Sequence, residues 1–363
     1  YGLNLRPLSV FASEVYRDDP CTYFYPHTLD DVVYDSIEHS LTAKMHKAIA
    51  VIQFKLEGQL IKNHPEYGMD GRCFFDKVDF GRGVINIGGK EYELRDKSFP
   101  TVDPSDPLKL SREESELVRI LQSSFRHSGR LRQHIKFIYD HGGMYRKING
   151  NLLYHGCIPL NDDGSFREIT LPFADCAGKT FHGKALLDRI EQEVRSAYFS
   201  PNGTKEQKEA ADFMWYLWCG ADSPLYGKDK MAFFERTFLG KEASELCTEH
   251  YEPYYSHTND ASVCEMILEE FGLDKRRGHI VNGHVPVLRC DGESPIKAGG
   301  KLFVIDGGIS KAYRVKTGIA GYTLIYDSHS LRLAEHKPYD GEGADITPKV
   351  SIVEKMERSF NIA

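Results

Sequence analysis

The chain has 363 residues, of which 41% are hydrophobic, and a formal net charge of -7 at pH 7. This length fits one large α/β domain with insertions, or two domains, rather than one small core. The acidic balance argues against general nucleic-acid binding, which normally shows a basic excess, so anionic ligands would have to bind local basic clusters.

The sequence shows no membrane segment and no secretory pattern. Its longest apolar runs fall far short of the roughly 20 residues that a membrane span needs, and no signal peptide opens it. The eight cysteines are scattered without a Cys-x-x-Cys pair, a pattern typical of reduced thiols in the cytoplasm. Because the chain begins at Tyr1 without a methionine, we expect a further segment upstream.

The first part of the chain is predicted to contain two long helices and a hairpin. Apolar residues recur every three or four positions over residues 28–63, which predicts an amphipathic helix. Residues 78–96 alternate apolar and polar side chains around Gly88-Gly89 and predict a β-hairpin. A second long helix is expected over residues 111–141, beginning at a Ser-Arg-Glu-Glu capping box. We expect these two helices to pair antiparallel.

A helical region and then a β-rich region follow. Helices are predicted over residues 184–198, 205–219, 228–238 and 261–271, with Ser, Gly, Asn and Pro between them. Short apolar runs between residues 279 and 337 predict strands. The predicted domains are a helical insertion with a β-hairpin (1–143), a core segment (144–175), a second helical insertion (176–278) and a β-rich core (279–363).

Two histidines each follow an apolar run and precede a turn. His155 lies in NLLYHGCIPL, and His284 lies in IVNGHVPV. Two such units predict a pair of metal ligands or acid/base groups that converge from neighbouring strand ends. The alternative for each histidine is a local hydrogen bond to a backbone carbonyl.

Two lysine-rich segments have the composition of a phosphate-binding site. GESPIKAGGKLFVIDGG contains Lys297 and Lys301 among glycines whose N–H groups can approach an anion. GADSPLYGKDKMAFFERTF places Lys228, Lys230 and Arg236 among aromatic residues, against which a sugar ring can lie. The alternatives are a solvated turn for the first segment and an amphipathic helix with core aromatics for the second.

Other candidate reactive groups have less support. Cys157 is the cysteine near a candidate base, His155, and no Gly-x-Ser-x-Gly elbow occurs, so a cysteine or serine hydrolase is weakly supported. Asp175 and Asp306 lie near predicted strand ends, but nothing in the sequence pairs them with a histidine.

Taken together, YHGCIPL, NGHVPV, GESPIKAGGK and SPLYGKDKMAFFER resemble the C-terminal half of the class III fructose-1,6-bisphosphatases, which are metallophosphoesterases. The resemblance covers essentially the whole chain. It implies an α/β fold, the second half of a calcineurin-like αββα sandwich with long helical insertions. The implied reaction removes the 1-phosphate of fructose 1,6-bisphosphate in gluconeogenesis at a two-metal Mn²⁺ site, with His155 and His284 as ligands. The lysines and Arg236 would then hold the substrate phosphates.

The chain departs from the family pattern in one respect. The Asp-x-His-Gly, Gly-Asp-x-x-Asp-Arg and Gly-Asn-His-Asp motifs of metallophosphoesterases do not occur in it, so the catalytic residues are unknown and expected upstream of residue 1. One alternative is therefore a catalytically incomplete phosphosugar-binding or regulatory fragment. Another is a phosphoprotein phosphatase-like hydrolase, which would not need the lysine-rich segments. The long helices would suit a homo-oligomer.

Overall fold

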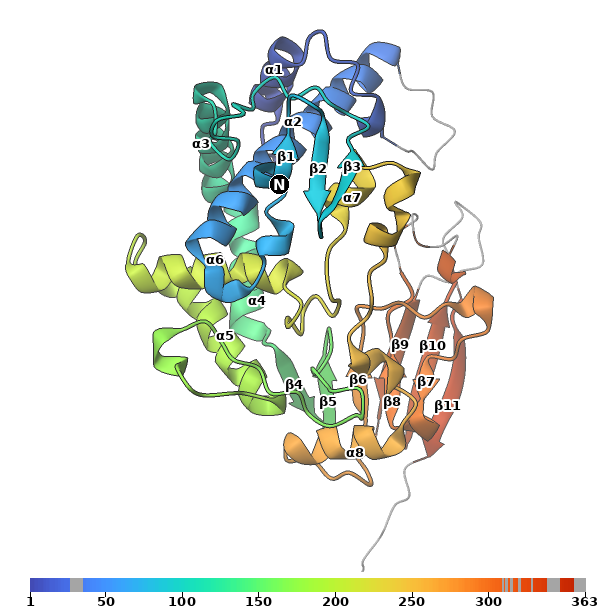
Figure 1. The fold of residues 1–363 in the computed structure, drawn as a ribbon. Coiled ribbons are helices and arrows are strands. Elements are labelled where there is room, and N and C mark those ends of the chain that lie inside the picture. Colours follow the sequence, from blue (N-terminus) through green and yellow to red (C-terminus); the bar gives the residue numbers. More distant parts are fainter. Residues whose placement is uncertain are drawn as a thin grey trace, which may run out of the picture. The chain divides into compact units, whose positions relative to one another are not determined.

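The computed structural model describes residues 1–26, 35–308, 310, 313, 316–318, 321–327, 329–337 and 347–355. The chain forms two compact units: unit 1 comprises residues 1–141 and 229–250, and unit 2 comprises residues 142–228 and 251–363. Helices and strands occur in both units (Figure 1), which confirms the mixed α/β class. Residues 28–34 of the predicted first long helix lie outside the described residues.

Unit 1 contains five α-helices and one small antiparallel sheet within its described residues. The sheet has the strand order β1-β2-β3. In chain order the elements are α1 (Arg6–Val15), α2 (Ser36–Asn63), β1 (Val78–Asp79), β2 (Val84–Ile87), β3 (Lys90–Glu93), α3 (Arg112–His127), α4 (Gly129–His141) and α7 (Phe233–Phe238).

The hairpin prediction for residues 78–96 is confirmed. Strands β2 and β3 pair antiparallel up to Ile87 and Lys90. Gly88 and Gly89, which form the turn between them, have φ values of 61° and 85°. Two successive positive φ angles match the twist of a hairpin, and glycine adopts them without a Cβ clash.

The second long helix is interrupted, contrary to the prediction of one helix over residues 111–141. Its start is as expected, because Ser111 and Glu114 form a reciprocal capping box. Ser128, however, has an extended backbone with ψ of 104°. Its N–H donates to the carbonyl of Phe125, and its own carbonyl accepts from the N–H of Arg132. Ser128 therefore ends α3 and begins α4.

The core of unit 1 is an aromatic cluster drawn from distant parts of the sequence. The ring of Phe54 on α2 lies 5.2 Å from that of Phe234 on α7 and 6.0 Å from that of Phe238. The rings of Phe74 and Phe234 are stacked at 4.3 Å. These four side chains are all buried, so the short helix α7 completes a core begun by α2.

Unit 2 contains a five-stranded mixed sheet, a three-stranded antiparallel sheet and three α-helices within its described residues. The larger sheet has the order β4-β5-β6-β8-β7, and the smaller has the order β11-β10-β9. The elements are β4 (Tyr145–Ile148), β5 (Asn151–Tyr154), α5 (Gly183–Phe199), α6 (Lys205–Cys219), α8 (Ala261–Glu270), β6 (Ile280–Asn282), β7 (Ile296–Lys297), β8 (Leu302–Val304), β9 (Gly321–Tyr326), β10 (Ser330–His336) and β11 (Lys349–Lys355).

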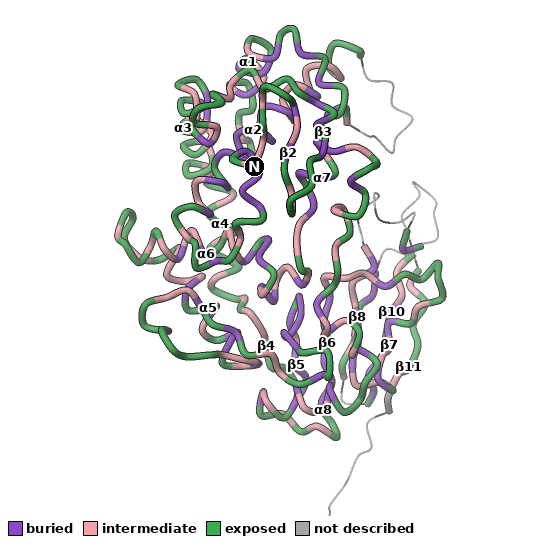
Figure 2. Tube along the Cα trace, in the orientation of Figure 1, coloured by how far each residue is buried: buried purple, intermediate pink, exposed green. Residues whose placement is uncertain are grey.

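Three parallel strands form the buried centre of unit 2. Strand β6 pairs in parallel with β5 on one side and with β8 on the other. Almost every residue of these strands is buried, as Figure 2 shows. Their apolar side chains share one core with Ile267 of α8 and Leu333 of β10. Because the strands are parallel, the residues that follow them emerge at one edge of the sheet.

The helix predicted over residues 228–238 is mostly wrong. Lys228 forms a bridge with Tyr251, and the N–H of Asp229 donates to the carbonyl of His250, so the chain is extended there and α7 begins only at Phe233. The other three predicted helices of this region are confirmed as α5, α6 and α8, with ends that differ by one residue at most.

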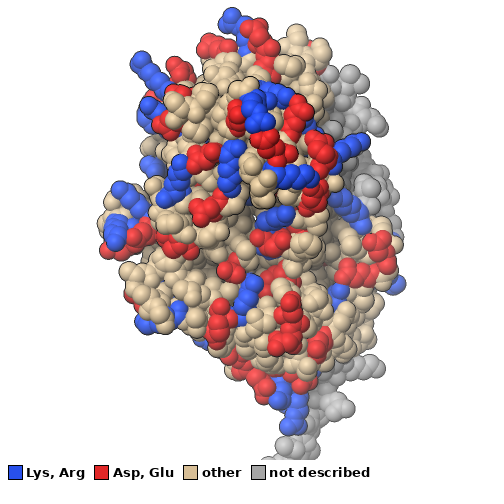
Figure 3. All heavy atoms as spheres, viewed as in Figure 1, with Lys and Arg blue, Asp and Glu red and all other residues tan. Residues whose placement is uncertain are grey.

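The described residues contain no helix with the length and apolar composition needed to cross a membrane. Lys and Arg side chains are interspersed with Asp and Glu over the face seen in Figure 3. On that face, positive charge is therefore divided into small clusters by carboxylates.

Candidate functional site

The two histidines singled out in the sequence lie side by side in unit 2. His155 directly follows β5, and His284 lies two residues after β6; because these strands are parallel neighbours, both residues emerge at the same sheet edge. The two ring centroids are 5.2 Å apart with an interplanar angle of 82°. The N–H of Gly283 donates to the carbonyl of His155 at 3.1 Å, which joins the two turns.

Asp306 is the third polar residue at this edge. It lies two residues after β8, the parallel neighbour of β6. A Cβ built on Gly283 would lie 3.5 Å from both His155 Nδ1 and the Asp306 Cβ, so both side chains lie close to the Gly283 backbone. Removal of water from part of the ring, together with nearby His284, lowers the pKa of His155, and Asp306 opposes this effect. A lowered pKa favours the neutral form of the His155 ring.

The ring of His284 is held by a backbone carbonyl. Its Nε2 lies 3.0 Å from the carbonyl oxygen of Tyr226. Because a carbonyl only accepts, Nε2 carries the hydrogen and Nδ1 of the neutral ring keeps its lone pair. The backbone φ at His284 is 69°, a left-handed conformation that a residue with a Cβ adopts only at a cost.

The side chain of Asn282 connects the two turns that carry the histidines. Its side-chain Nδ2 donates to the carbonyl of Gly156 at 3.1 Å and to the hydroxyl of Tyr254 at 3.2 Å. Asn282 is buried, and its Oδ1 has no partner among the described residues. It borders a small cavity of about 70 Å³ that is also lined by Lys297.

His155 and Asp306 line a larger cavity of about 600 Å³. This volume is in the range of small-molecule sites. The lining residues come from β4, β5, β6, the loop after β8, and β9 and β10: Gly143, Met144, Tyr145, Arg146, Leu153, Tyr154, His155, Val281, Asn282, Gly283, Ile305, Asp306, Gly307, Gly321, Tyr322, Thr323 and His336.

The donor chemistry of this edge fits part of a metal site. Two neutral imidazoles suit borderline metals, and a ligand histidine commonly donates its other ring N–H to a carbonyl, as His284 does to Tyr226. Within the part of the chain that the structure describes, no group of three or more His, Cys, Asp or Glu side chains is arranged to hold a metal ion. His155 and His284 thus amount to an incomplete set of ligands.

The five predicted phosphate-binding cations are placed differently. Lys228 lies two residues after Tyr226, beside the His284 turn, with its Nζ 5.2 Å from the ring centroid of Tyr251. Lys297 lines the small cavity next to Gly283 and pairs with Glu293. These two lysines are the predicted cations that unit 2 places near the histidines.

The other three cations are not brought to the histidines within unit 2. Lys301 precedes β8, at the end of the sheet opposite Asp306, and its Nζ donates to the carbonyls of Lys275 and Arg276. Lys230 and Arg236 belong to unit 1. There the guanidinium of Arg236 pairs with Glu249 at 3.0 Å.

The weakly supported cysteine nucleophile does not suit the structure. Cys157 is buried, and burial raises the pKa of its thiol well above the usual value. Its Sγ donates to the carbonyl of Pro224. Asp175, the other carboxylate noted in the sequence, forms a two-point ion pair with Arg189. Neither residue is part of the histidine edge.

Sequence reasoning missed three contributors to this site. Asp306 was noted without a partner, although its place directly after a predicted strand was the available signal. Asn282 lies in a predicted apolar strand, and an amide side chain in such a strand signals a buried hydrogen-bonding role. No sequence signal pointed to the carbonyl of Tyr226, because every residue has a backbone acceptor.

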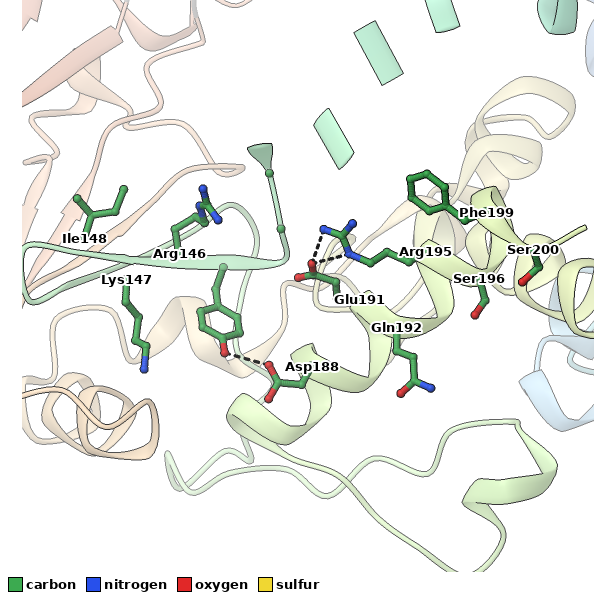
Figure 4. Close-up of a pocket in the computed structure, with 13 residues that line it drawn as sticks. Arg146, Lys147, Ile148, Asp188, Glu191, Gln192, Arg195, Ser196, Phe199 and Ser200 are labelled. Carbon is green, nitrogen blue, oxygen red and sulfur yellow. Dashed lines mark hydrogen bonds and ion pairs between the residues drawn. The ribbon is translucent and has the colours of Figure 1, made fainter. Parts of the chain in front are cut away.

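A second, more open cavity of about 1110 Å³ lies between β4 and α5 (Figure 4). Its carboxylates already have partners: Glu191 holds Arg195 at 2.8 Å, and Asp188 accepts the hydroxyl hydrogen of Tyr145 at 2.9 Å. This cavity shares Gly143, Tyr145 and Arg146 with the histidine cavity.

Comparison with known proteins gives a consistent result. Residues 1–363 match the family described as Firmicute fructose-1,6-bisphosphatase. The chain is 49% identical over 361 residues to the fructose-1,6-bisphosphatase class 3 of Bacteroides fragilis (strain YCH46), covering 98% of this chain and 53% of the relative. It is 49% identical over 339 residues to that of Listeria innocua (93% and 51%), and 47% identical over 369 residues to that of Clostridium novyi (100% and 54%).

The chain spans about half the length of the curated relatives that it matches. No solved protein structure matches it.

Proposed function

The chain belongs to the Firmicute fructose-1,6-bisphosphatase family, and on this basis we propose that it takes part in hydrolysis of the 1-phosphate of fructose 1,6-bisphosphate, which yields fructose 6-phosphate and phosphate in gluconeogenesis. The observation that carries the proposal is the convergence of His155, His284 and Asp306 at one sheet edge, where His155 and Asp306 line a cavity large enough for a sugar bisphosphate.

The metal proposal concerns the two imidazoles. His155 and His284 would hold an Mn²⁺ ion as part of a two-metal site. Such an ion would supply charge neutralisation for the phosphoryl oxygens and activation of water. The lowered pKa of His155 supports this proposal because it favours the neutral form of the ring, which is the form that binds a metal. The hydrogen bond to Tyr226 fixes the His284 ring with its Nδ1 lone pair available.

Two lysines are the best-placed groups for binding phosphate near the histidines. Lys228 follows the Tyr226 carbonyl by two residues, and Lys297 lies beside Gly283. Lys297 also pairs with Glu293. Lys301 is left out of the proposed site because its ammonium binds two backbone carbonyls at the opposite end of the sheet.

A second candidate function is binding of a phosphosugar without turnover. It is favoured by one observation: the described residues provide no complete group of metal ligands. In this case the chain would bind the phosphorylated sugar through its cations and the histidine cavity, and catalysis would need ligands from elsewhere.

The two candidates are separated by measuring phosphate release from fructose 1,6-bisphosphate with and without added Mn²⁺. Turnover that depends on Mn²⁺ and is lost in His155→Ala and His284→Ala supports the hydrolase. Binding of fructose 1,6-bisphosphate without turnover supports the binding function. Turnover of a phosphopeptide in place of the sugar would instead identify a protein phosphatase. His182→Ala is the matched control, because His182 pairs with Glu168 at the surface of the same unit.

We also propose a cytoplasmic location and self-association, on separate grounds. All eight cysteines are free thiols, which suits a reducing compartment. Helix α4 has no buried residue, and Phe137 and Ile138 on it are 63% and 60% exposed. A second copy of the chain would cover such apolar side chains, and light scattering on the purified protein would give the number of copies.

A further inference from the structure

Arg146 occupies a distinctive position at the edge of the larger sheet of unit 2. It lies on β4, the outer strand, directly opposite Leu153 of β5. Figure 4 shows Arg146 and Ile148 on one side of the strand and Lys147 on the other, as the pleat of a strand requires. Arg146 and Leu153 therefore share a face of the sheet.

This face leads to the histidine site. His155 comes two residues after Leu153, which makes it a diagonal neighbour of Arg146 across the two strands. Diagonal neighbours lie about 7–8 Å apart, with their Cβ atoms somewhat closer, which is within reach of a long side chain. Arg146, His155 and Asp306 all line the same cavity of about 600 Å³.

The guanidinium of Arg146 has no ion pair or hydrogen bond within the parts of the chain that the structure describes. The nearest carboxylates on α5 serve other groups: Asp188 pairs with Lys184, and Glu191 pairs with Arg195 and accepts the N–H of Met144. An exposed arginine beside a cavity, with all five of its N–H donors available, is suited to a planar, two-point contact with a phosphate.

Strands β9 and β10 add polar groups to the cavity lining. His336 on β10 and Thr323 on β9 both line it, and the Thr323 hydroxyl lies 2.7 Å from His336 Nε2. The cavity is therefore lined by polar groups of the histidine edge and, separately, by polar groups of β9 and β10. A ligand with two separated anionic groups matches this distribution better than a single phosphate does.

We propose that Arg146 binds the phosphate that is not hydrolysed, the 6-phosphate of the sugar, and so selects sugar bisphosphates over sugar monophosphates. This inference rests on the proposed function, since it names a subsite of the same cavity. Arg146 is a binding residue, and the inference gives it no part in bond cleavage.

The test is calorimetric titration of fructose 6-phosphate, which carries only the phosphate assigned to Arg146. Arg146→Gln is expected to weaken binding at least about tenfold, because a charge-assisted contact is lost. Arg146→Lys keeps the charge but not the two-point geometry and is expected to fall between Arg146→Gln and the unsubstituted chain. Lys147→Gln is the matched control: it removes one positive charge from the other side of the same strand, where Lys147 Nζ donates to the carbonyl of Phe271.

Each outcome is informative. Equal losses in Arg146→Gln and Lys147→Gln, or no loss in Arg146→Gln, would overturn the inference, and so would an absence of fructose 6-phosphate binding to the unsubstituted chain. If binding depends on Arg146 but no phosphate is released from fructose 1,6-bisphosphate, the subsite stands and the hydrolase proposal fails. If phosphate is released but fructose 6-phosphate binds Arg146→Gln as tightly as it binds the unsubstituted chain, the hydrolase proposal stands and the subsite proposal fails.

Discussion

The imidazole of His284 donates its Nε2 hydrogen to the carbonyl oxygen of Tyr226 at 3.0 Å, while its own backbone has a left-handed φ of 69°. The ring is thus fixed at the expense of backbone strain. Strain of this kind at a polar residue beside a cavity is typical of a functional position, where geometry is maintained by the surrounding structure.

This strain predicts that His284→Gly is more stable than His284→Ala, by about 1 kcal/mol, because glycine adopts the left-handed conformation without a Cβ clash. Both variants lose the hydrogen bond to Tyr226, so the difference between their free energies of unfolding measures the cost of the left-handed backbone at residue 284. Urea unfolding of the two variants measures it. His134, in the interior of helix α4, is the control, and there alanine is expected to be more stable than glycine. Equal stability of the two His284 variants would show that the strain is absent.

Gly156→Ala is expected to destabilise unit 2 by about 1–3 kcal/mol, a typical cost of overpacking. A Cβ at residue 156 would lie 2.0 Å from the carbonyl oxygen of Pro224, a backbone atom that also accepts the N–H of Cys157. The turn that holds His155 would shift, so the proposed binding of fructose 1,6-bisphosphate should weaken as well. In Gly71→Ala the new Cβ meets nothing within 4 Å, and its stability should be nearly unchanged. Thermal unfolding and calorimetry compare the two variants.

In unit 1, the ion pair between Lys55 and Glu114 is fully buried, with 2.7 Å between Nζ and Oε2. Glu114→Gln leaves a buried ammonium without its carboxylate and is expected to cost about 3–5 kcal/mol. Adding Lys55→Met should recover much of that loss, since the uncompensated charge is then gone. Denaturant unfolding of both single variants and the double variant tests this, and additive losses would count against a coupled pair.

Glu235 predicts a pH-dependent effect. Its side chain is buried, its Oε2 has no partner among the described residues, and burial raises the pKa of its carboxyl. A raised pKa means that the folded state binds the proton of Glu235 more tightly than the unfolded state does. The stability gained from this proton is complete below the usual glutamate pKa and is lost as the pH rises through the pKa of Glu235 in the folded state. Glu235→Gln should therefore stabilise the protein at pH 8 and less so at pH 5.

Unfolding free energies at the two pH values measure this difference. Glu245→Gln is the control, because Glu245 is exposed and pairs with Lys90, and its removal should bring no stabilisation at pH 8. A gain from Glu235→Gln that is independent of pH would point to packing rather than ionisation.

The fold was predictable where local signals dominate. The capping box at Ser111 and the paired glycines at 88 and 89 specify a helix start and a turn through their own backbone chemistry. The break at Ser128 was missed because the apolar periodicity continues across it. The helix over residues 228–238 was overpredicted because pairing with the distant residues 250–251 prevails over local helix propensity there.

The candidate site was predictable only in part. His155 and His284 could be singled out because each follows an apolar strand and precedes a turn, and parallel pairing of those strands brings the rings together. Arg146 had no such signal, since its relation to His155 depends on the hairpin register of β4 and β5. Lys301 looked like Lys297 in the sequence, and both lie at the hairpin end of β7 and β8. Their side chains differ: Lys301 Nζ donates to the carbonyls of Lys275 and Arg276, whereas Lys297 lines the small cavity beside Gly283.

The discontinuity of unit 1 has a consequence for synthesis on the ribosome. Residues 1–141 emerge before Phe234 and Phe238, which complete the aromatic core around Phe54 and Phe74 and come more than ninety residues after residue 141. Until residue 250 has left the exit tunnel, the growing chain exposes the rings of Phe54 and Phe74. Exposed apolar side chains of this kind form a surface that chaperones bind. Unit 1 can therefore finish folding only after much of unit 2 has already been translated.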